Sequence, residues 1–205
     1  MSGYDSAWQE SFLSGPIGSR IDSDFENIVC DPTFILDDAD PNHTFVFSNE
    51  WPCETPRDYL HNMGWCSILP FYYIEKLQEN NPTTIYDLGC GNDFFARYYD
   101  NIIGIDMNIG VDIDDEWFSE REGTMEAFVS FNGLNMQNPG NIGKYKNLLT
   151  DTGRGVITFS GRNFEIPLNE TETENIIRSH VNVIEYETVI QPIGFDGATR
   201  VIFSK

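Results

Sequence analysis

A strand-like segment that ends in two glycines, followed by a second one that ends in an acid, carries the clearest chemistry in this sequence. Residues 85–94 read Ile-Tyr-Asp-Leu-Gly-Cys-Gly-Asn-Asp-Phe, and residues 101–106 read Asn-Ile-Ile-Gly-Ile-Asp. Because Gly89 and Gly91 lack a Cβ, a ligand can approach the backbone there, and the N–H groups that open a following helix would face the same point. Asp106 can accept hydrogen bonds from both hydroxyls of a ribose. The pattern predicts a nucleoside-binding crevice.

Two details distinguish this turn from a dinucleotide-binding turn. Asp87 lies two residues before the first glycine, and Asp93 followed by Phe94 stands where a third glycine is expected. A negative side chain inside the turn suits a ligand with a cationic amino group or a sulfonium better than a pyrophosphate. Cys90 lies between the two glycines, where a disulfide would block the crevice, so we expect a reduced thiol there.

With these features the chain resembles the class I S-adenosylmethionine-dependent methyltransferases. The first motif of that family reads acid-x-Gly-x-Gly, and its second strand ends in an acid. Residues 128–134, Phe-Val-Ser-Phe-Asn-Gly-Leu, look like the fourth-strand motif of the family's small-molecule branch. Residues 148–159 look like the helix, turn and fifth strand that follow. The resemblance covers roughly residues 56–205 and implies S-adenosylmethionine as the cofactor.

The resemblance also assigns roles to individual residues. Asp106 would accept hydrogen bonds from the ribose, and Asp112 or Asp114 could border the adenine. The residues expected to bind the cofactor are Asp87, Gly89, Cys90, Gly91, Asp106, Asp112 and Ser130. Two alternatives remain open, namely a tight strand-to-helix turn that binds nothing and an ordinary strand-end acid that caps a turn at position 106.

The strand expected near residues 126–131, which matches the fourth strand of the family, would end beside the methyl acceptor. By the resemblance, Asn132 would lie beside the departing methyl group, with Ser130 and Phe131 shaping the wall. Nucleic-acid enzymes that methylate amino groups follow this position with Pro-Pro and an aromatic residue, so that a flipped base can be held. Here Gly133 and Leu134 follow instead, which disfavours methylation of a base.

Catalytic groups other than Asn132 are few. Methyl transfer is an in-line displacement, and a base is needed only if the acceptor must lose a proton. His61 and His180 are candidates by residue type, and either could instead be a surface or helix-packing histidine. We take Asn132 and His61 as the catalytic candidates. Four aromatic residues before the first strand could form a lid over the acceptor or belong to the core. They are Tyr59, Trp65, Tyr72 and Tyr73.

The composition limits the partners that this chain can have. The net charge is −21 at pH 7, and Arg20 is the only basic residue before Arg57. Such a field repels a phosphate backbone, because affinity for nucleic acid comes largely from Lys and Arg. DNA and RNA are therefore disfavoured, and a small-molecule acceptor is expected. The charge could provide a solvated surface or serve a dedicated role such as salt adaptation or nucleic-acid mimicry.

Cysteine spacing and apolar runs bear on metals and location. The four cysteines lack CxxC spacing, so we expect no structural metal. The amino terminus carries acids rather than a basic region followed by an apolar run, and no apolar window has the length of a membrane span. We therefore expect a cytoplasmic protein with no membrane segment.

Two regions differ in pattern. Residues 1–55 are rich in turn signals and predict an acidic, loop-rich N-terminal extension, whose aromatic residues indicate that it packs on something. This extension could also bind a protein partner. Residues 56–205 are predicted to form the methyltransferase-like domain, in which residues 57–77 show helical spacing. Strands are expected near 83–88, 101–106, 126–131 and 154–160, and helices near 92–100, 114–121, 139–149 and 170–179.

The last two strands differ from the others. Segments 181–190 and 198–204 are joined by too few residues for a crossover helix, so they must pair as an antiparallel hairpin. The predicted fold class is α/β, a Rossmann-like three-layer sandwich with a mostly parallel sheet and a C-terminal antiparallel hairpin. Residues 110–114 follow Asp106 after only a few residues, which predicts that the helix usually found between the second and third strands of the family is missing.

Three functions are compatible with this sequence. The first is an S-adenosylmethionine-dependent methyltransferase that acts on a small molecule or a protein side chain. The second is a methyltransferase-fold protein with a degenerate site that acts as a binding or structural component of an assembly. The third is a nicotinamide-dependent oxidoreductase, which gives Asp87 and the terminal hairpin no role.

Overall fold

The structure is a computed structural model of the 205-residue chain. It describes residues 6–20, 69–90, 95–106, 110–111, 113–131, 133–134, 136, 138–160, 169–189 and 198–205. The chain divides into two compact units, residues 1–72 and residues 73–205. The predicted domain boundary between residues 55 and 56 lies outside the described residues and stays a prediction.

The first unit contains helix α1 (Ser6–Ser14), and residues 16–20 are also helical. Trp8 and Phe12 stack with ring centroids 5.0 Å apart on one side of α1. Phe71 lies 5.3 Å from Phe12, and Tyr72 meets Trp8 edge to face at 5.1 Å. These aromatic contacts provide the packing that the composition of the extension predicts.

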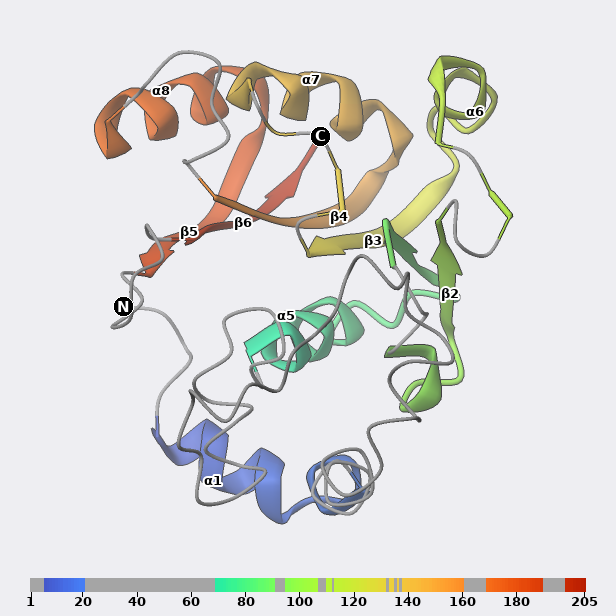
Figure 1. The fold of residues 1–205 in the computed structure, drawn as a ribbon, viewed down its shortest axis with the longest axis vertical. Helices are drawn as coiled ribbons and strands as arrows, with labels where there is room; N and C mark the ends of the chain where they lie inside the picture. Colours follow the sequence, from blue (N-terminus) through green and yellow to red (C-terminus); the bar gives the residue numbers. More distant parts are fainter. Residues whose placement is uncertain are drawn as a thin grey trace, which may run out of the picture. The chain divides into compact units, whose positions relative to one another are not determined.

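The second unit contains a six-stranded mixed sheet (Figure 1). Its strands lie in the order β2-β1-β3-β4-β6-β5. The four strands from β2 to β4 are parallel, whereas β6 runs antiparallel to both β4 and β5. The bounds are β1 (Ile85–Leu88), β2 (Ile102–Ile105), β3 (Met125–Phe131), β4 (Leu149–Ser160), β5 (Asn182–Val189) and β6 (Ala198–Ser204). This arrangement confirms the predicted α/β fold class and its C-terminal antiparallel hairpin.

Helices cover both faces of this sheet. Figure 1 shows α7 (Ile142–Tyr145) and α8 (Glu170–His180) on one face. Residues 73–78, the part of α5 (Leu69–Gln78) that belongs to this unit, lie on the other face. The short helices are η1 (Phe95–Arg97), α6 (Asp115–Glu120), η3 (Pro139–Asn141) and η4 (Lys146–Leu148). Among the described residues, α6 is the helix between β2 and β3. None of the described helices is long and apolar enough to cross a lipid bilayer.

Strand β4 begins five residues earlier than the sequence predicts. The expected helix at 139–149 is instead a succession of short turns, η3, α7 and η4, that ends at Leu148. Pro139 begins this stretch, and β4 then starts at Leu149. Met125 of β3 pairs with Leu149 and Ala127 pairs with Arg154, so the register shifts between these two pairs. The residues of β4 between Leu149 and Arg154 therefore form a bulge-like irregularity in the strand instead of a helix.

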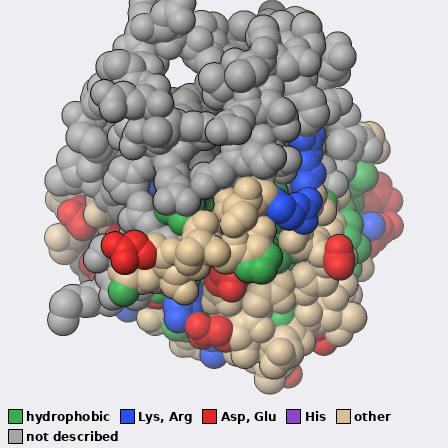
Figure 2. Space-filling model, turned by 90° about the horizontal axis from the view of Figure 1, so that it is seen from below, with side chains coloured by type: hydrophobic (Ala, Val, Ile, Leu, Met, Phe, Trp, Pro, Cys, Tyr) green, Lys and Arg blue, Asp and Glu red, His purple; other side chains and the backbone are tan. Residues whose placement is uncertain are grey.

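Charged side chains are dispersed on the face of the molecule in Figure 2. Acidic side chains lie at separate places among uncharged ones, with several Lys and Arg side chains between them. Specific pairs occur as well, since Lys144 contacts Asp115 and Arg178 contacts Glu174 at 2.8 Å. The hydrogen bond and positive charge of Lys144 hold the pKa of Asp115 below its ordinary value. On this face the charge has the distribution of a solvated surface.

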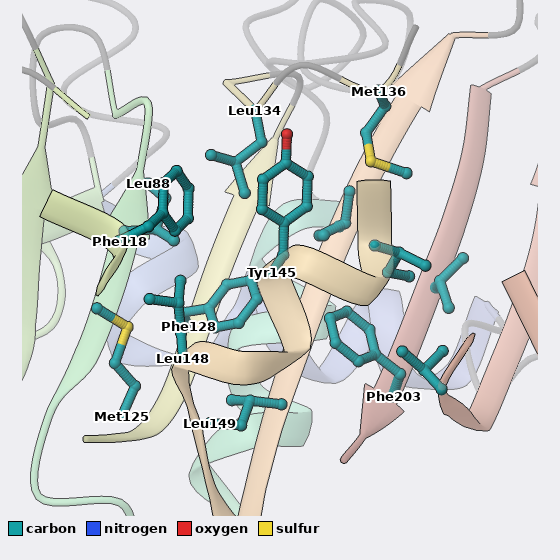
Figure 3. Close-up of a cluster of buried hydrophobic side chains, with 14 of the residues drawn as sticks. Leu88, Phe118, Met125, Phe128, Leu134, Met136, Tyr145, Leu148, Leu149 and Phe203 are labelled. Carbon is teal, nitrogen blue, oxygen red and sulfur yellow. The ribbon is translucent and has the colours of Figure 1, made fainter. Parts of the chain in front are cut away.

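The main core lies between the sheet and the helices α7 and α8 (Figure 3). Phe128 of β3 and Phe203 of β6 meet edge to face at 5.8 Å across β4. Gly155 of β4 is the cross-strand neighbour of both Phe128 and Phe203, and a Cβ on Gly155 would lie 2.7 Å from the Phe203 ring. A glycine is therefore required in β4 so that the two large rings can meet above it. Burial in this core raises the pKa of Tyr145 to about 12.

The start of α8 generates a prediction about stability. Asn169 accepts a hydrogen bond from the backbone N–H of Glu172, and the Glu172 carboxylate accepts one from the backbone N–H of Asn169, both at 2.9 Å. Asn169→Ala should lower the free energy of unfolding by about 1 kcal/mol, because one backbone donor loses its partner. Urea denaturation measures this change. Asn175→Ala, at an exposed position inside the same helix, is the control and should cause no loss.

Candidate functional site

The carboxyl ends of β1, β2 and β3 meet at one edge of the sheet. From β1 the chain passes to β2 on one side and later to β3 on the other, so the strand order reverses at β1. In open α/β sheets, ligands bind outside the carboxyl ends of the strands at such a switch point. The predicted glycine turn follows β1 directly at this place.

The turn after β1 is fixed to the end of β2. The backbone N–H of Gly89 donates a hydrogen bond to the Ile105 carbonyl oxygen at 2.7 Å, and that of Cys90 approaches the same oxygen at 3.4 Å. Asp106 follows Ile105, so this acid lies beside the glycine turn, and its side chain is partly exposed. The Asp106 carbonyl in turn accepts a hydrogen bond from Val111 at 2.9 Å. Asp106 and the glycine turn, which the sequence predicts to form one site, are thus neighbours in space.

Asp87 lies inside the protein. Asp87 is 2% exposed, and it lies in β1 directly beside Gly104 of β2 and Val129 of β3. Side chains alternate along a strand, so Asp87 faces away from the core that contains Leu88 and toward the α5 face of the sheet. A carboxylate at such a position is sheltered from water, where its charge interacts strongly with any neighbouring cation.

Gly89 and Gly133 pack backbone against backbone. Gly89 has φ of +77°, and a Cβ on it would lie 2.3 Å from Gly133 Cα. A Cβ on Gly133 would lie 2.4 Å from the Leu88 carbonyl oxygen and 2.6 Å from Gly89 Cα. From the sequence alone, the approach of a ligand would account for the glycine at position 89. The structure adds a different requirement, because the missing Cβ of Gly89 makes room for the segment that follows β3.

Ser130 joins the same two segments by hydrogen bonds. Its hydroxyl donates to the Leu88 carbonyl oxygen at 2.7 Å and accepts from the backbone N–H of Leu134 at 2.9 Å. The Ser130 side chain is fully buried. These partners are backbone groups of the protein, and a direct contact between Ser130 and a cofactor stays a prediction.

Several predicted site residues cannot be placed. Gly91, Asp112, Asn132 and His61 lie outside the described residues, as do Tyr59 and Trp65. Both chain neighbours of position 132 are described, since Phe131 ends β3 and Gly133 contacts Gly89. The roles predicted for these residues stay predictions.

Asp114 has a structural role in the part of the chain that the structure describes. Its carboxylate accepts a hydrogen bond from the backbone N–H of Trp117 at 2.8 Å and caps the start of α6. This contact fits the preference for Asp at the N-cap position, directly before the first residue of a helix. A role for Asp114 beside an adenine ring is not needed to explain the residue.

His180 lies far from the glycine turn along the strands. It ends α8, and β5 begins two residues later at Asn182. Register pairs lead from Asn182 across β6, β4 and β3 to Ile85, the first residue of β1. His180 is therefore at the amino ends of the parallel strands, whereas the turn is at their carboxyl ends. Its ring packs on α7, where a Cβ on Gly143 would lie 2.9 Å from its Nδ1.

Tyr72 and Tyr73 are both buried. Tyr72 takes part in the aromatic cluster of the first unit, and Tyr73 donates a hydrogen bond to Glu187 Oε2 at 3.0 Å. Burial and the nearby negative charge of Glu187 raise the pKa of Tyr73 well above its ordinary value, so the phenol stays neutral. Their burial agrees with the core alternative of the sequence analysis rather than with an exposed lid.

Sequence reasoning missed a row of polar side chains on the α5 face. Thr158, Arg200 and Glu187 are cross-strand neighbours on β4, β6 and β5, and Arg200 is only 4% exposed. Tyr73 extends the row through Glu187. A lone Arg within an apolar strand is the signal that could have predicted this row. No group of three or more His, Cys, Asp or Glu side chains that could hold a metal occurs among the described residues.

Comparison with known proteins yields matches among solved structures. No protein-family model matches the chain, and no curated protein is significantly similar to it. The N-methyltransferase NodS from Bradyrhizobium japonicum WM9 is similar in fold, with a TM-score of 0.48, 13% identity and coverage of 66% of this chain and 93% of that chain. Magnesium protoporphyrin IX methyltransferase (ChlM) from Synechocystis PCC 6803, with bound S-adenosylhomocysteine, has a TM-score of 0.46, 11% identity and coverage of 73% and 85%.

A third similar structure is 1,6-didemethyltoxoflavin-N1-methyltransferase from Burkholderia thailandensis, with a TM-score of 0.43, 15% identity and coverage of 73% and 81%. These likenesses are likenesses of fold at low sequence identity.

The contact between Gly89 and Gly133 generates a second prediction. Gly133→Ala should lower the free energy of unfolding by about 3 kcal/mol, because the added methyl meets backbone atoms that cannot rotate away. Gly123→Ala is the control, since Gly123 has φ of +69° but nothing within 4 Å of an added Cβ, and it should cost about 1 kcal/mol. Urea denaturation compares the two. Equal losses would contradict the tight contact.

Proposed function

We propose that this chain binds S-adenosylmethionine at the carboxyl ends of β1 and β2 and transfers its methyl group to a small molecule or a protein side chain. The position of Asp106 beside the glycine turn, at the point where the strand order reverses, is the observation that carries this proposal. An acid there can accept hydrogen bonds from the two hydroxyls of a ribose.

Two carboxylates near this turn, those of Asp106 and Asp87, support the proposed binding of S-adenosylmethionine. Asp106 is partly exposed, so its carboxylate can reach a ligand at the edge of the sheet. Asp87 supplies a second negative charge from inside the sheet, which favours a ligand that carries an amino group or a sulfonium. The N–H groups of Gly89 and Cys90 already point to Ile105, so backbone donors to the ligand must come from residues after position 90.

The chemistry needs alignment more than it needs a protein base. When bound, S-adenosylmethionine supplies an electrophilic methyl group for an in-line displacement. The protein would hold the cofactor through Asp106 and Asp87, and would place Asn132 beside the acceptor at the end of β3. Holding two reactants in line can supply much of the rate enhancement. An acceptor whose lone pair is available without loss of a proton fits this site best, and His61 remains the proposed base for other acceptors.

The proposal extends to partners and location. A small-molecule acceptor agrees with the net charge of −21, which disfavours a nucleic-acid substrate. We propose a cytoplasmic location, because the Cys90 side chain in the glycine turn is a thiol, and thiols stay reduced in that compartment. The N-terminal extension remains a candidate for binding a protein partner.

A second candidate function is a binding or structural component with an idle site. The described polar groups at the carboxyl edge favour it, because Gly89, Cys90 and Ser130 direct their hydrogen bonds to the protein itself. A glycine turn stabilised in this way can persist without a ligand. Ligand binding separates the two functions.

A thermal-shift comparison tests for the cofactor. S-adenosylhomocysteine at 100 times its dissociation constant should stabilise the fold by about 2.7 kcal/mol, because it binds only the folded chain. S-adenosylmethionine should also raise the melting temperature, and NAD should leave it unchanged. If neither adenosyl compound shifts the melting of well-folded protein, the structural function is favoured over the enzyme.

A variant of Asp106 tests the proposed contact to the ribose. Asp106→Ala should weaken binding of S-adenosylhomocysteine by about 10-fold to 100-fold, since charge-assisted hydrogen bonds are lost. Isothermal titration calorimetry measures the affinity. Asp100→Ala is the matched control, because Asp100 is an exposed acid that precedes β2 at the opposite edge of the sheet. An Asp106→Ala protein that binds as tightly as the control would exclude the contact.

A further inference from the structure

Ser130 occupies an unusual position for a buried hydroxyl. It lies in β3 one residue before the last residue of the strand, and it uses both its donor and an acceptor on backbone groups. The donor reaches the Leu88 carbonyl oxygen in the neighbouring strand, and the acceptor takes the N–H of Leu134 farther along its own chain. Alanine can do neither of these, whereas a serine hydroxyl can donate one hydrogen bond and accept others.

The two hydrogen bonds close a loop around the end of β3. Leu134 is four residues after Ser130, so the bond between them brackets positions 131–133. Within this bracket Gly133 presses against Gly89, and Phe131 packs on Phe95 with ring centroids 5.2 Å apart. Position 132 therefore lies between two neighbours that are each held to described parts of the fold.

The same hydrogen bonds also hold the start of the glycine turn. The Leu88 carbonyl oxygen belongs to the last residue of β1, and Gly89 follows it. Ser130 thus connects the turn after β1 with the segment after β3 by a direct hydrogen bond on each side. In the proposed function the first segment binds the cofactor, and the second carries Asn132.

We propose that Ser130 is a positioning residue of this site, which sets the segment after β3 against the glycine turn through its two backbone hydrogen bonds. The inference rests on the proposed function and deepens it. Transfer between two bound groups depends steeply on their alignment, and a displacement of about 1 Å can cost about 100-fold in rate. A hydroxyl that fixes both segments therefore controls how well they enclose the cofactor together.

Two variants that each remove a buried hydroxyl test this proposal. Ser130→Ala removes the connection, and Thr173→Val is the matched control. The Thr173 hydroxyl is also buried and donates to a backbone carbonyl, that of Asn169 in α8, at 3.0 Å. Both variants should lose stability, because each removes a buried hydroxyl's hydrogen bond to a backbone carbonyl. Only Ser130→Ala should weaken binding of S-adenosylhomocysteine, by about tenfold in calorimetry at a temperature where all proteins are folded.

Two further measurements show how Ser130 acts. Ser130→Thr keeps the hydroxyl, so a folded Ser130→Thr protein should bind S-adenosylhomocysteine within about threefold of the wild type, even if the added methyl lowers its stability. Hydrogen exchange read by NMR should show a protected Leu134 amide in the wild type that exchanges faster in Ser130→Ala. The amides of α8 should keep their relative protection.

The outcomes separate this inference from the proposed function. If the wild type does not bind S-adenosylhomocysteine, the proposed function and the positioning role both fail. If the wild type binds it and Ser130→Ala binds equally well, or loses no more affinity than Thr173→Val, the positioning role alone is wrong. A Leu134 amide that exchanges at the same rate in both proteins would also overturn it.

Discussion

The close contact between the backbones of Gly89 and Gly133 is the constraint on which the rest of this site depends. No side chain can stand between the two segments, since a single Cβ on either residue would overlap main-chain atoms of the other segment. The contact therefore fixes the separation of the turn after β1 from the segment after β3. Protein interiors relax poorly around such an overlap, so this geometry is encoded by the two glycines together.

The polar groups around this contact are matched to one another. Ile105 accepts from the Gly89 turn, and Ser130 bonds to Leu88 and Leu134 on the side of β3. The two acids differ in their surroundings, because Asp87 is enclosed by the sheet and Asp106 reaches its rim. In the proposed function a ligand would interact with the buried carboxylate of Asp87 and the partly exposed carboxylate of Asp106. The backbone N–H groups of Gly89 and Cys90 instead donate to the Ile105 carbonyl oxygen.

Local patterns predicted the fold more fully than the site. The strand and glycine motif located β1, and the short connection before residue 198 predicted the reversed β6, because seven residues cannot hold a crossover helix. The early start of β4 could not be predicted, since it depends on an irregular pairing with β3, a strand distant along the chain. The contact of Gly133 with Gly89 and the cross-strand pairing of buried Arg200 with Glu187 also join residues distant in sequence, which periodicity does not reveal.

The placement of β6 has a consequence for the order in which this protein can acquire its structure. β6 follows β5 along the chain, yet it lies between β4 and β5 in the sheet. During synthesis β5 would emerge with no strand to pair with, and the side of β4 would remain open until β6 inserts. Completion of the sheet must therefore wait for the last strand, and the interval before it arrives is when unwanted association between nascent chains is most favoured.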